Sequence, residues 1–77
     1  MEDNLIVFIK NELANDPDAE VKSTTKLISS GLVDSFSLVT LQIYIEKEFG
    51  VKIPAPQITT DTFDTVEQMA SIIRQYL

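Results

Sequence analysis

The stretch that decides the fold is SFSLVTLQIYIEKEFG, residues 35–50. It predicts a helix over residues 35–49 that ends at Gly50 as a C-terminal cap. At about 100° per residue, the apolar side chains of this helix form two stripes centred roughly 150° apart. We expect one stripe to face the core and the other to be exposed as a contact surface. The core stripe comprises Leu38, Leu41, Ile45 and Phe49, and the second stripe comprises Phe36, Val39 and Ile43.

A competing interpretation places the second stripe under the polar segment 16–34, because small bundles often use loops as covers. That cover would be complete, or it would reach Phe36 alone and leave Val39 and Ile43 exposed.

Helical periodicity also precedes this segment. Residues 3–14 carry an apolar face, and Asp16-Pro17 is expected to end this first helix, since a residue before proline avoids the α region. The long loop over residues 16–34 follows, and its scattered apolar residues can pin it to the bundle.

The chain beyond Gly50 predicts an extended exit over residues 51–54 and at most one helical turn at 60–63. Thr65 and Gln68 have the spacing of a capping box, so the last helix is expected to begin near Thr65. The chain is therefore predicted to be all-α: a small four-helix bundle, with three main helices, one short helix and a long loop between the first two main helices.

The composition excludes several classes of function. The 77 residues fit a single domain, 1–77, and contain no cysteine and no histidine. This rules out a disulfide scaffold and a thiolate metal site, and it removes the usual general base. A formal net charge of −6 argues against nucleic acid and anionic membranes. No apolar run is long enough for membrane insertion, and the cytoplasm is the expected compartment. No metal site is expected.

Asp34 and Ser35 stand at the start of the central helix. Asp34 suits the N-cap position, and Ser35 falls in the first turn, where free N–H groups and the helix dipole favour an anion. Taken alone, this dipeptide indicates only a cap. Ser29 and Ser30 precede the cap, and Ser37 lies about 200° round the helix from Ser35. Ser35 is therefore the candidate hydroxyl.

Longer blocks add a family resemblance. The blocks GLVDSF (31–36), IEKEFGVKIP (45–54) and TFDTV (62–66) resemble the acyl carrier and peptidyl carrier protein family over essentially the whole chain. The resemblance implies that Ser35 carries a covalent 4′-phosphopantetheine arm taken from coenzyme A. The thiol of the arm would hold acyl or aminoacyl groups as thioesters. The protein would then be a shuttle and not an enzyme, with no catalytic residues of its own.

The resemblance also implies partners. These are a phosphopantetheinyl transferase, an activating or loading enzyme (an adenylating ligase or an acyltransferase) and a downstream synthase. The partner-binding residues would be Asp34, Phe36, Val39 and Ile43, and the protein is expected to be a monomer.

Two departures from the commonest family pattern bear on the pathway. Phe36 stands where leucine or methionine is more usual, and this resembles some aminoacyl carriers, including D-alanyl carriers. After Asp34 the central helix has only Glu46 and Glu48 as acids, whereas fatty-acid carriers have an acidic helix there. We therefore expect an aminoacyl, non-ribosomal peptide or polyketide pathway. A fatty-acid carrier, or an unmodified adaptor that binds through the second stripe, remains an alternative.

Overall fold

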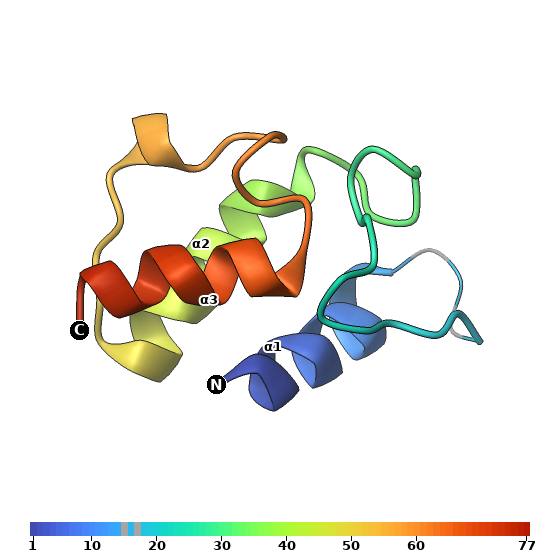
Figure 1. Cartoon of the computed structure of the whole chain (residues 1–77), viewed down its shortest axis with the longest axis horizontal. Coiled ribbons are helices and arrows are strands. Elements are labelled where there is room, and N and C mark those ends of the chain that lie inside the picture. Colours follow the sequence, from blue (N-terminus) through green and yellow to red (C-terminus); the bar gives the residue numbers. More distant parts are fainter. Residues whose placement is uncertain (15, 17) are drawn as a thin grey trace.

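The computed structural model describes residues 1–14, 16 and 18–77, and these residues contain helices and turns but no strand. The chain begins with α1 (Glu2–Phe8), which continues directly into the π-helical turn η1 (Ile9–Leu13). The later elements are α2 (Ser37–Phe49), the 3₁₀ turn η2 (Ala55–Gln57) and α3 (Val66–Gln75). This confirms the predicted all-α class (Figure 1).

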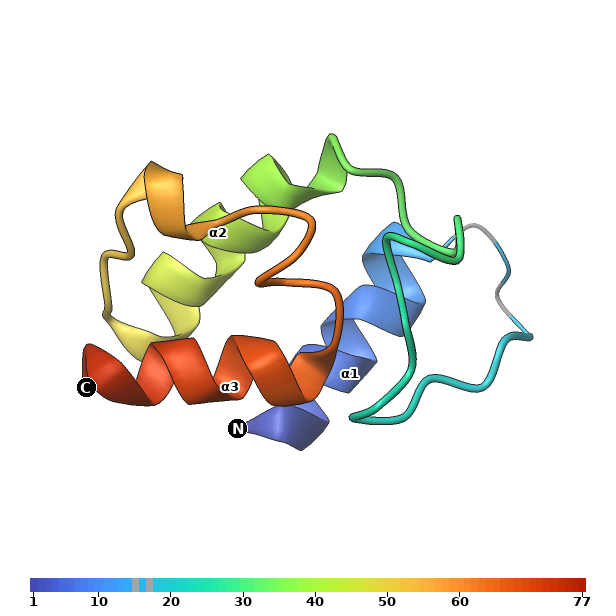
Figure 2. The ribbon, with the colours of Figure 1, turned by 45° about the horizontal axis from the view of Figure 1, so that its top comes forward.

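The apolar faces of the three helices meet in one core. Figure 2 shows α2 running above α3, with α1 beside the start of α3. The predicted core stripe of α2 is confirmed: Leu38, Leu41 and Ile45 are buried, and Phe49 is half-buried against them. The other buried residues of this core are Leu5, Ile9, Val21, Leu27, Val33, Val51, Ile53, Phe63, Val66, Met69 and Ile73.

The long connection between η1 and α2 is held by three of these core residues, Val21, Leu27 and Val33. Most of it lies beyond the helices at one end of the molecule (Figure 1). Its described residues form no helix or strand, which is unusual for so long a connection in a small domain. The three buried side chains hold its later part against the core.

Two helix boundaries differ from prediction. α2 begins at Ser37, two residues later than expected. The preceding turn has hydrogen bonds between residues three apart, and not four apart as in an α-helix: the Ser37 N–H donates to the Asp34 carbonyl (2.9 Å) and the Leu38 N–H to the Ser35 carbonyl (3.2 Å). The first helix ends at Leu13, since Ala14 is already extended. Pro17, which was expected to end it, lies outside the described residues. The C-terminal boundary at Gly50 is confirmed, with φ 67°.

The short helix was expected at residues 60–63 and lies instead at Ala55–Gln57. Pro56 favours this position because proline fixes φ in the helical range and needs no hydrogen-bond partner in a first turn. Residues 60–63 form only a turn, closed by a bond from the Phe63 N–H to the Thr59 carbonyl (2.9 Å). The capping box of Thr65 and Gln68 at the start of α3 is confirmed.

Two isoleucines on opposite sides of α2 provide a test of this packing. Ile45→Ala should lower the free energy of unfolding by about 2–5 kcal/mol, because Ile45 is 1% exposed and its loss leaves a cavity. Ile43→Ala is the matched control, because Ile43 is 51% exposed, and it should cost less than about 0.5 kcal/mol. Urea unfolding followed by circular dichroism measures both, and equal losses would contradict the assignment of the two faces.

Candidate functional site

Ser35 lies in the turn that leads into α2 and its side chain is exposed. The Asp34 carboxylate accepts a hydrogen bond from the Phe36 N–H (2.9 Å) and so caps this turn. The prediction of Asp34 as the N-cap of the central helix is wrong, because α2 begins later and its N-cap is Phe36, without a side-chain bond. The Ser35 hydroxyl makes no hydrogen bond with any other described residue. The turn therefore presents an unengaged hydroxyl to solvent.

The competing serines are occupied or partly covered. The Ser29 hydroxyl donates to the Asp64 carboxylate (2.7 Å), and the Ser30 hydroxyl donates to the Lys26 carbonyl (2.6 Å). Ser37 lies within α2 and is half-buried. A phosphodiester on Ser35 would break no hydrogen bond of its hydroxyl, whereas one on Ser29 or Ser30 would remove a contact that holds the loop.

The chain reaches this turn through a left-handed residue. Gly31 has φ 83°, and its N–H donates to the Ile28 carbonyl (3.1 Å). Beyond Gly31 and its two chain neighbours, no heavy atom lies within 4 Å of the position that a Cβ at Gly31 would occupy, so the backbone conformation alone favours glycine here. The Val33 N–H then donates to the Leu27 carbonyl (2.9 Å), which closes the loop before Asp34.

Asp64 anchors this loop to the start of α3. Its buried carboxylate accepts hydrogen bonds from the Ile28 N–H (2.7 Å), the Ser29 N–H (3.0 Å) and the Ser29 hydroxyl (2.7 Å). Its carbonyl accepts a fourth bond from the Leu27 N–H (2.8 Å). Sequence reasoning missed this role, because the partners lie 35 and 36 residues away and no local spacing indicates them.

The environment of Asp64 favours its charged form. Burial raises the pKa of the carboxyl group, but the hydrogen bonds from Ser29 and Ile28 and the nearby charge of Lys26 lower it by more, so the pKa lies below its ordinary value. A carboxyl group with a depressed pKa stabilises the fold above its unfolded-state pKa. That stabilisation is lost as the pH falls through the folded-state pKa.

The second stripe of α2 is exposed. Phe36 is 84% exposed, Val39 64% and Ile43 51%. The interpretation in which segment 16–34 covers the stripe is therefore wrong, also in its partial form, since Phe36 is the most exposed of the three. The stripe begins at the residue after Ser35, so an apolar surface adjoins the candidate hydroxyl.

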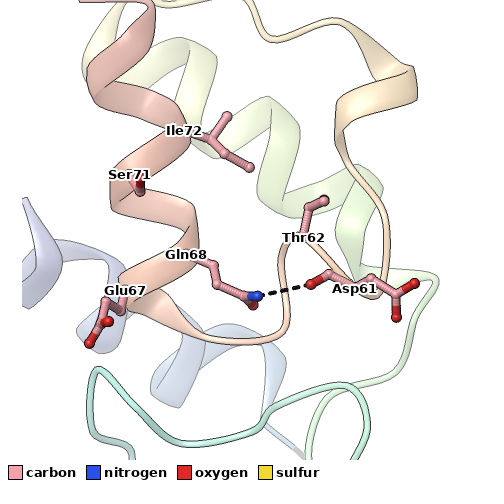
Figure 3. Close-up of a pocket in the computed structure, with 6 residues that line it drawn as sticks. All are labelled: Asp61, Thr62, Glu67, Gln68, Ser71 and Ile72. Atoms are coloured by element: carbon pink, nitrogen blue, oxygen red, sulfur yellow. Dashed lines mark hydrogen bonds between the residues drawn. The ribbon is translucent and has the colours of Figure 1, made fainter.

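A shallow groove lies apart from these residues, between the start of α3 and the turn before it (Figure 3). The Gln68 side-chain amide crosses the groove and donates to the Asp61 carbonyl (2.9 Å). None of the predicted site residues lines it. Within the described part of the chain, no group of three acidic residues is placed to hold a metal ion, and no helix is long and apolar enough to cross a bilayer.

Comparison with known proteins agrees with this geometry. A family model described as "Phosphopantetheine attachment site" matches residues 6–73, which include Asp34, Ser35 and the whole of α2. The chain belongs to this family. It is a carrier protein, and its cofactor is 4′-phosphopantetheine. Carriers of this family work with a phosphopantetheinyl transferase and with loading enzymes.

Two curated relatives are similar over most of their length. A D-alanyl carrier protein of Bacillus pumilus (strain SAFR-032) is 28% identical over 67 residues, which cover 87% of this chain and 86% of the relative. A D-alanyl carrier protein of Lacticaseibacillus casei (strain BL23) is 25% identical over 72 residues, which cover 94% of this chain and 89% of the relative.

The anchor at Asp64 predicts a pH-dependent loss of stability. At pH 7, Asp64→Asn should lower the free energy of unfolding by about 1–3 kcal/mol, because it weakens charge-assisted bonds to the loop. The gap between wild type and variant should begin to narrow below about pH 4, where the carboxyl group takes up a proton in the unfolded chain, and it should close as the pH falls through the lower pKa of the folded state. Urea unfolding at pH 7 and at pH 3 measures the gap.

Asp61→Asn is the matched control, because Asp61 is exposed and its carboxylate makes no hydrogen bond or ion pair within the described residues. It should leave the pH dependence of the wild type unchanged. A stability gap for Asp64→Asn that is the same at both pH values would contradict the assigned role of the carboxylate.

Proposed function

We propose that Ser35 carries the phosphopantetheine arm and that residues 1–77 act as one carrier domain without catalytic activity. The observation that supports this is the contrast between the serines: Ser35 is exposed and unengaged at the start of α2, while Ser29 and Ser30 bond within the loop. The helix start also suits the phosphodiester, because the dipole of α2 favours a negative charge there.

Attachment needs a base from another protein. The Ser35 oxygen would attack the phosphorus that bears the pantetheine in coenzyme A, form a P–O bond and release adenosine 3′,5′-bisphosphate. The serine proton must go to a base, but the chain contains no histidine, and the Asp34 carboxylate bonds to the Phe36 N–H. The transferase would therefore supply the base.

The surface that partners recognise would comprise Asp34 and the exposed stripe of Phe36, Val39 and Ile43. Three exposed apolar side chains beside the arm can be buried by an enzyme that receives the arm. A shuttle must also leave each enzyme, so we expect micromolar affinities, of order −8 kcal/mol. The protein would act as a cytoplasmic monomer.

The cargo would be an aminoacyl group loaded by an adenylating ligase, before a downstream enzyme receives it. Two features support this: both relatives described above are D-alanyl carriers, and Phe36 follows the Asp-Ser pair as in some aminoacyl carriers. D-alanine is the first cargo to test.

The attachment site can be tested by mass. Incubation of the unmodified protein with coenzyme A and a promiscuous phosphopantetheinyl transferase should add one phosphopantetheine, and Ser35→Ala should abolish the gain. Ser37→Ala, the matched control, should be modified like the wild type. Intact-mass spectrometry measures the gain, and circular dichroism checks that both variants are folded. A gain that persists in Ser35→Ala would overturn the assignment, and partner binding that needs no modification would favour the adaptor.

The contact surface can be tested with a loading enzyme. Val39→Asp in the modified protein should lower kcat/KM for D-alanine loading by an adenylating ligase at least about tenfold, because a carboxylate would be buried without a partner. Leu77→Asp adds the same charge at another exposed apolar position and should have little effect. Unchanged loading of Val39→Asp would remove the stripe from the contact surface, and unfolding of this variant would place Val39 in the core.

A further inference from the structure

A contact between aromatic rings joins α1 and α2, away from the exposed stripe that begins at Phe36. The rings of Phe8 and Tyr44 stack with centroids 3.9 Å apart and planes 13° from parallel. The Tyr44 hydroxyl donates to the Asn4 carbonyl (3.3 Å), and the Tyr44 ring meets Phe49 edge to face. Neither ring is fully buried, so this aromatic pair is part of the surface between the two helices.

A groove of about 340 Å³ opens at this pair. Phe8 and Tyr44 line it together with Val7, which is 57% exposed. Glu12 from η1 and Glu48 from α2 add two exposed carboxylates to this lining, and Asn4 and Asn11 add neutral polar side chains. The groove thus combines aromatic and aliphatic surface from α1 and α2 with acid groups from η1 and α2.

The two carboxylates are not neutralised. Neither Glu12 nor Glu48 forms an ion pair within the described residues, and no lysine or arginine lines the groove. The field of Glu48 reaches the aromatic pair: burial raises the pKa of the Tyr44 hydroxyl, and the charge of Glu48 raises it further. With a net charge of −6 behind it, the groove is complementary to a cation and repels phosphate groups.

The groove is also separate from the arm. On α2, Tyr44 and Glu48 lie about 130° round the helix axis from the exposed stripe that begins at Phe36. A protein in the groove would leave the stripe and the Ser35 turn open to a second protein.

We propose that the groove between α1 and α2 is a second docking site, and that its occupant is a partner protein's exposed segment in which arginine stands beside aliphatic residues. A guanidinium group can stack on an aromatic ring and, at the same time, donate hydrogen bonds in its own plane to carboxylates. The groove offers rings in Phe8 and Tyr44 and carboxylates in Glu12 and Glu48. An aliphatic residue next to this arginine in the partner's segment would pack against Val7. Lysine would bind less well, because its ammonium group is not planar: it cannot stack flat on a ring or form two parallel hydrogen bonds with one carboxylate.

The test is a titration of the isotope-labelled protein with the blocked peptide Leu-Arg-Arg-Leu, followed by NMR. Saturable shifts are expected at Val7, Phe8 and Tyr44, with weaker binding of Leu-Lys-Lys-Leu and none of Leu-Glu-Glu-Leu. The pair Glu12→Gln and Glu48→Gln should weaken binding at least about fivefold, because it removes both carboxylate charges. The control pair Glu46→Gln and Glu67→Gln removes two charges elsewhere and should have little effect.

Val7→Ser provides a second variant that leaves the charge unchanged, and it should also weaken binding. Ser35→Ala should bind the peptide like the wild type, so the outcome is independent of the attachment site. The proposal is overturned by the absence of saturable shifts or by shifts confined to the stripe of Phe36, Val39 and Ile43. It is also overturned if the two double glutamate-to-glutamine variants bind the peptide equally well. Shifts in the groove that depend on protein concentration alone would assign it to a second copy of this chain.

Discussion

The Asp64 carboxylate is the contact on which the position of the Ser35 turn depends. The described residues of the connection between η1 and α2 form no helix or strand, and ordering a free segment of that length is costly in conformational entropy. Asp64 accepts three hydrogen bonds from Ile28 and Ser29, and its carbonyl accepts a fourth from Leu27. The loop is thereby fixed to α3 a few residues before the turn. The turn before α3, near the far end of the sequence, thus holds the loop that leads to α2.

Local signals predicted much of this architecture. The spacing of apolar residues identified the core stripe of α2, Gly50 marked its end, and Thr65 with Gln68 marked the start of α3. Each of these signals acts within one or two helical turns, so the sequence contains it directly. The bond of the Asp34 carboxylate to the Phe36 N–H is equally local, but it closes the turn before α2, whose N-cap is Phe36.

The features that were not predicted depend on distant contacts or on competing local effects. Asp64 bonds to residues more than thirty positions away, and no periodicity encodes such a pair. The short helix formed at Ala55–Gln57, where Pro56 outweighed the weaker pattern at residues 60–63. Exposure of Phe36 could not be decided either, because it depended on the path of the loop, which Val21, Leu27 and Val33 direct toward the core.

The tight turn before α2 has a mechanical consequence. Ser35 stands ahead of the regular helix, and its carbonyl bonds to Leu38 across three residues. On the assignment proposed above, the arm would be attached to this turn and not to the regular helix. The nearest buried side chains are Val33, two positions before Ser35, and Leu38, three positions after it. On the proposed assignment, the arm would extend from an exposed turn that core residues hold at both ends, so delivery of its cargo to one enzyme after another would need no change in the packing of the helices.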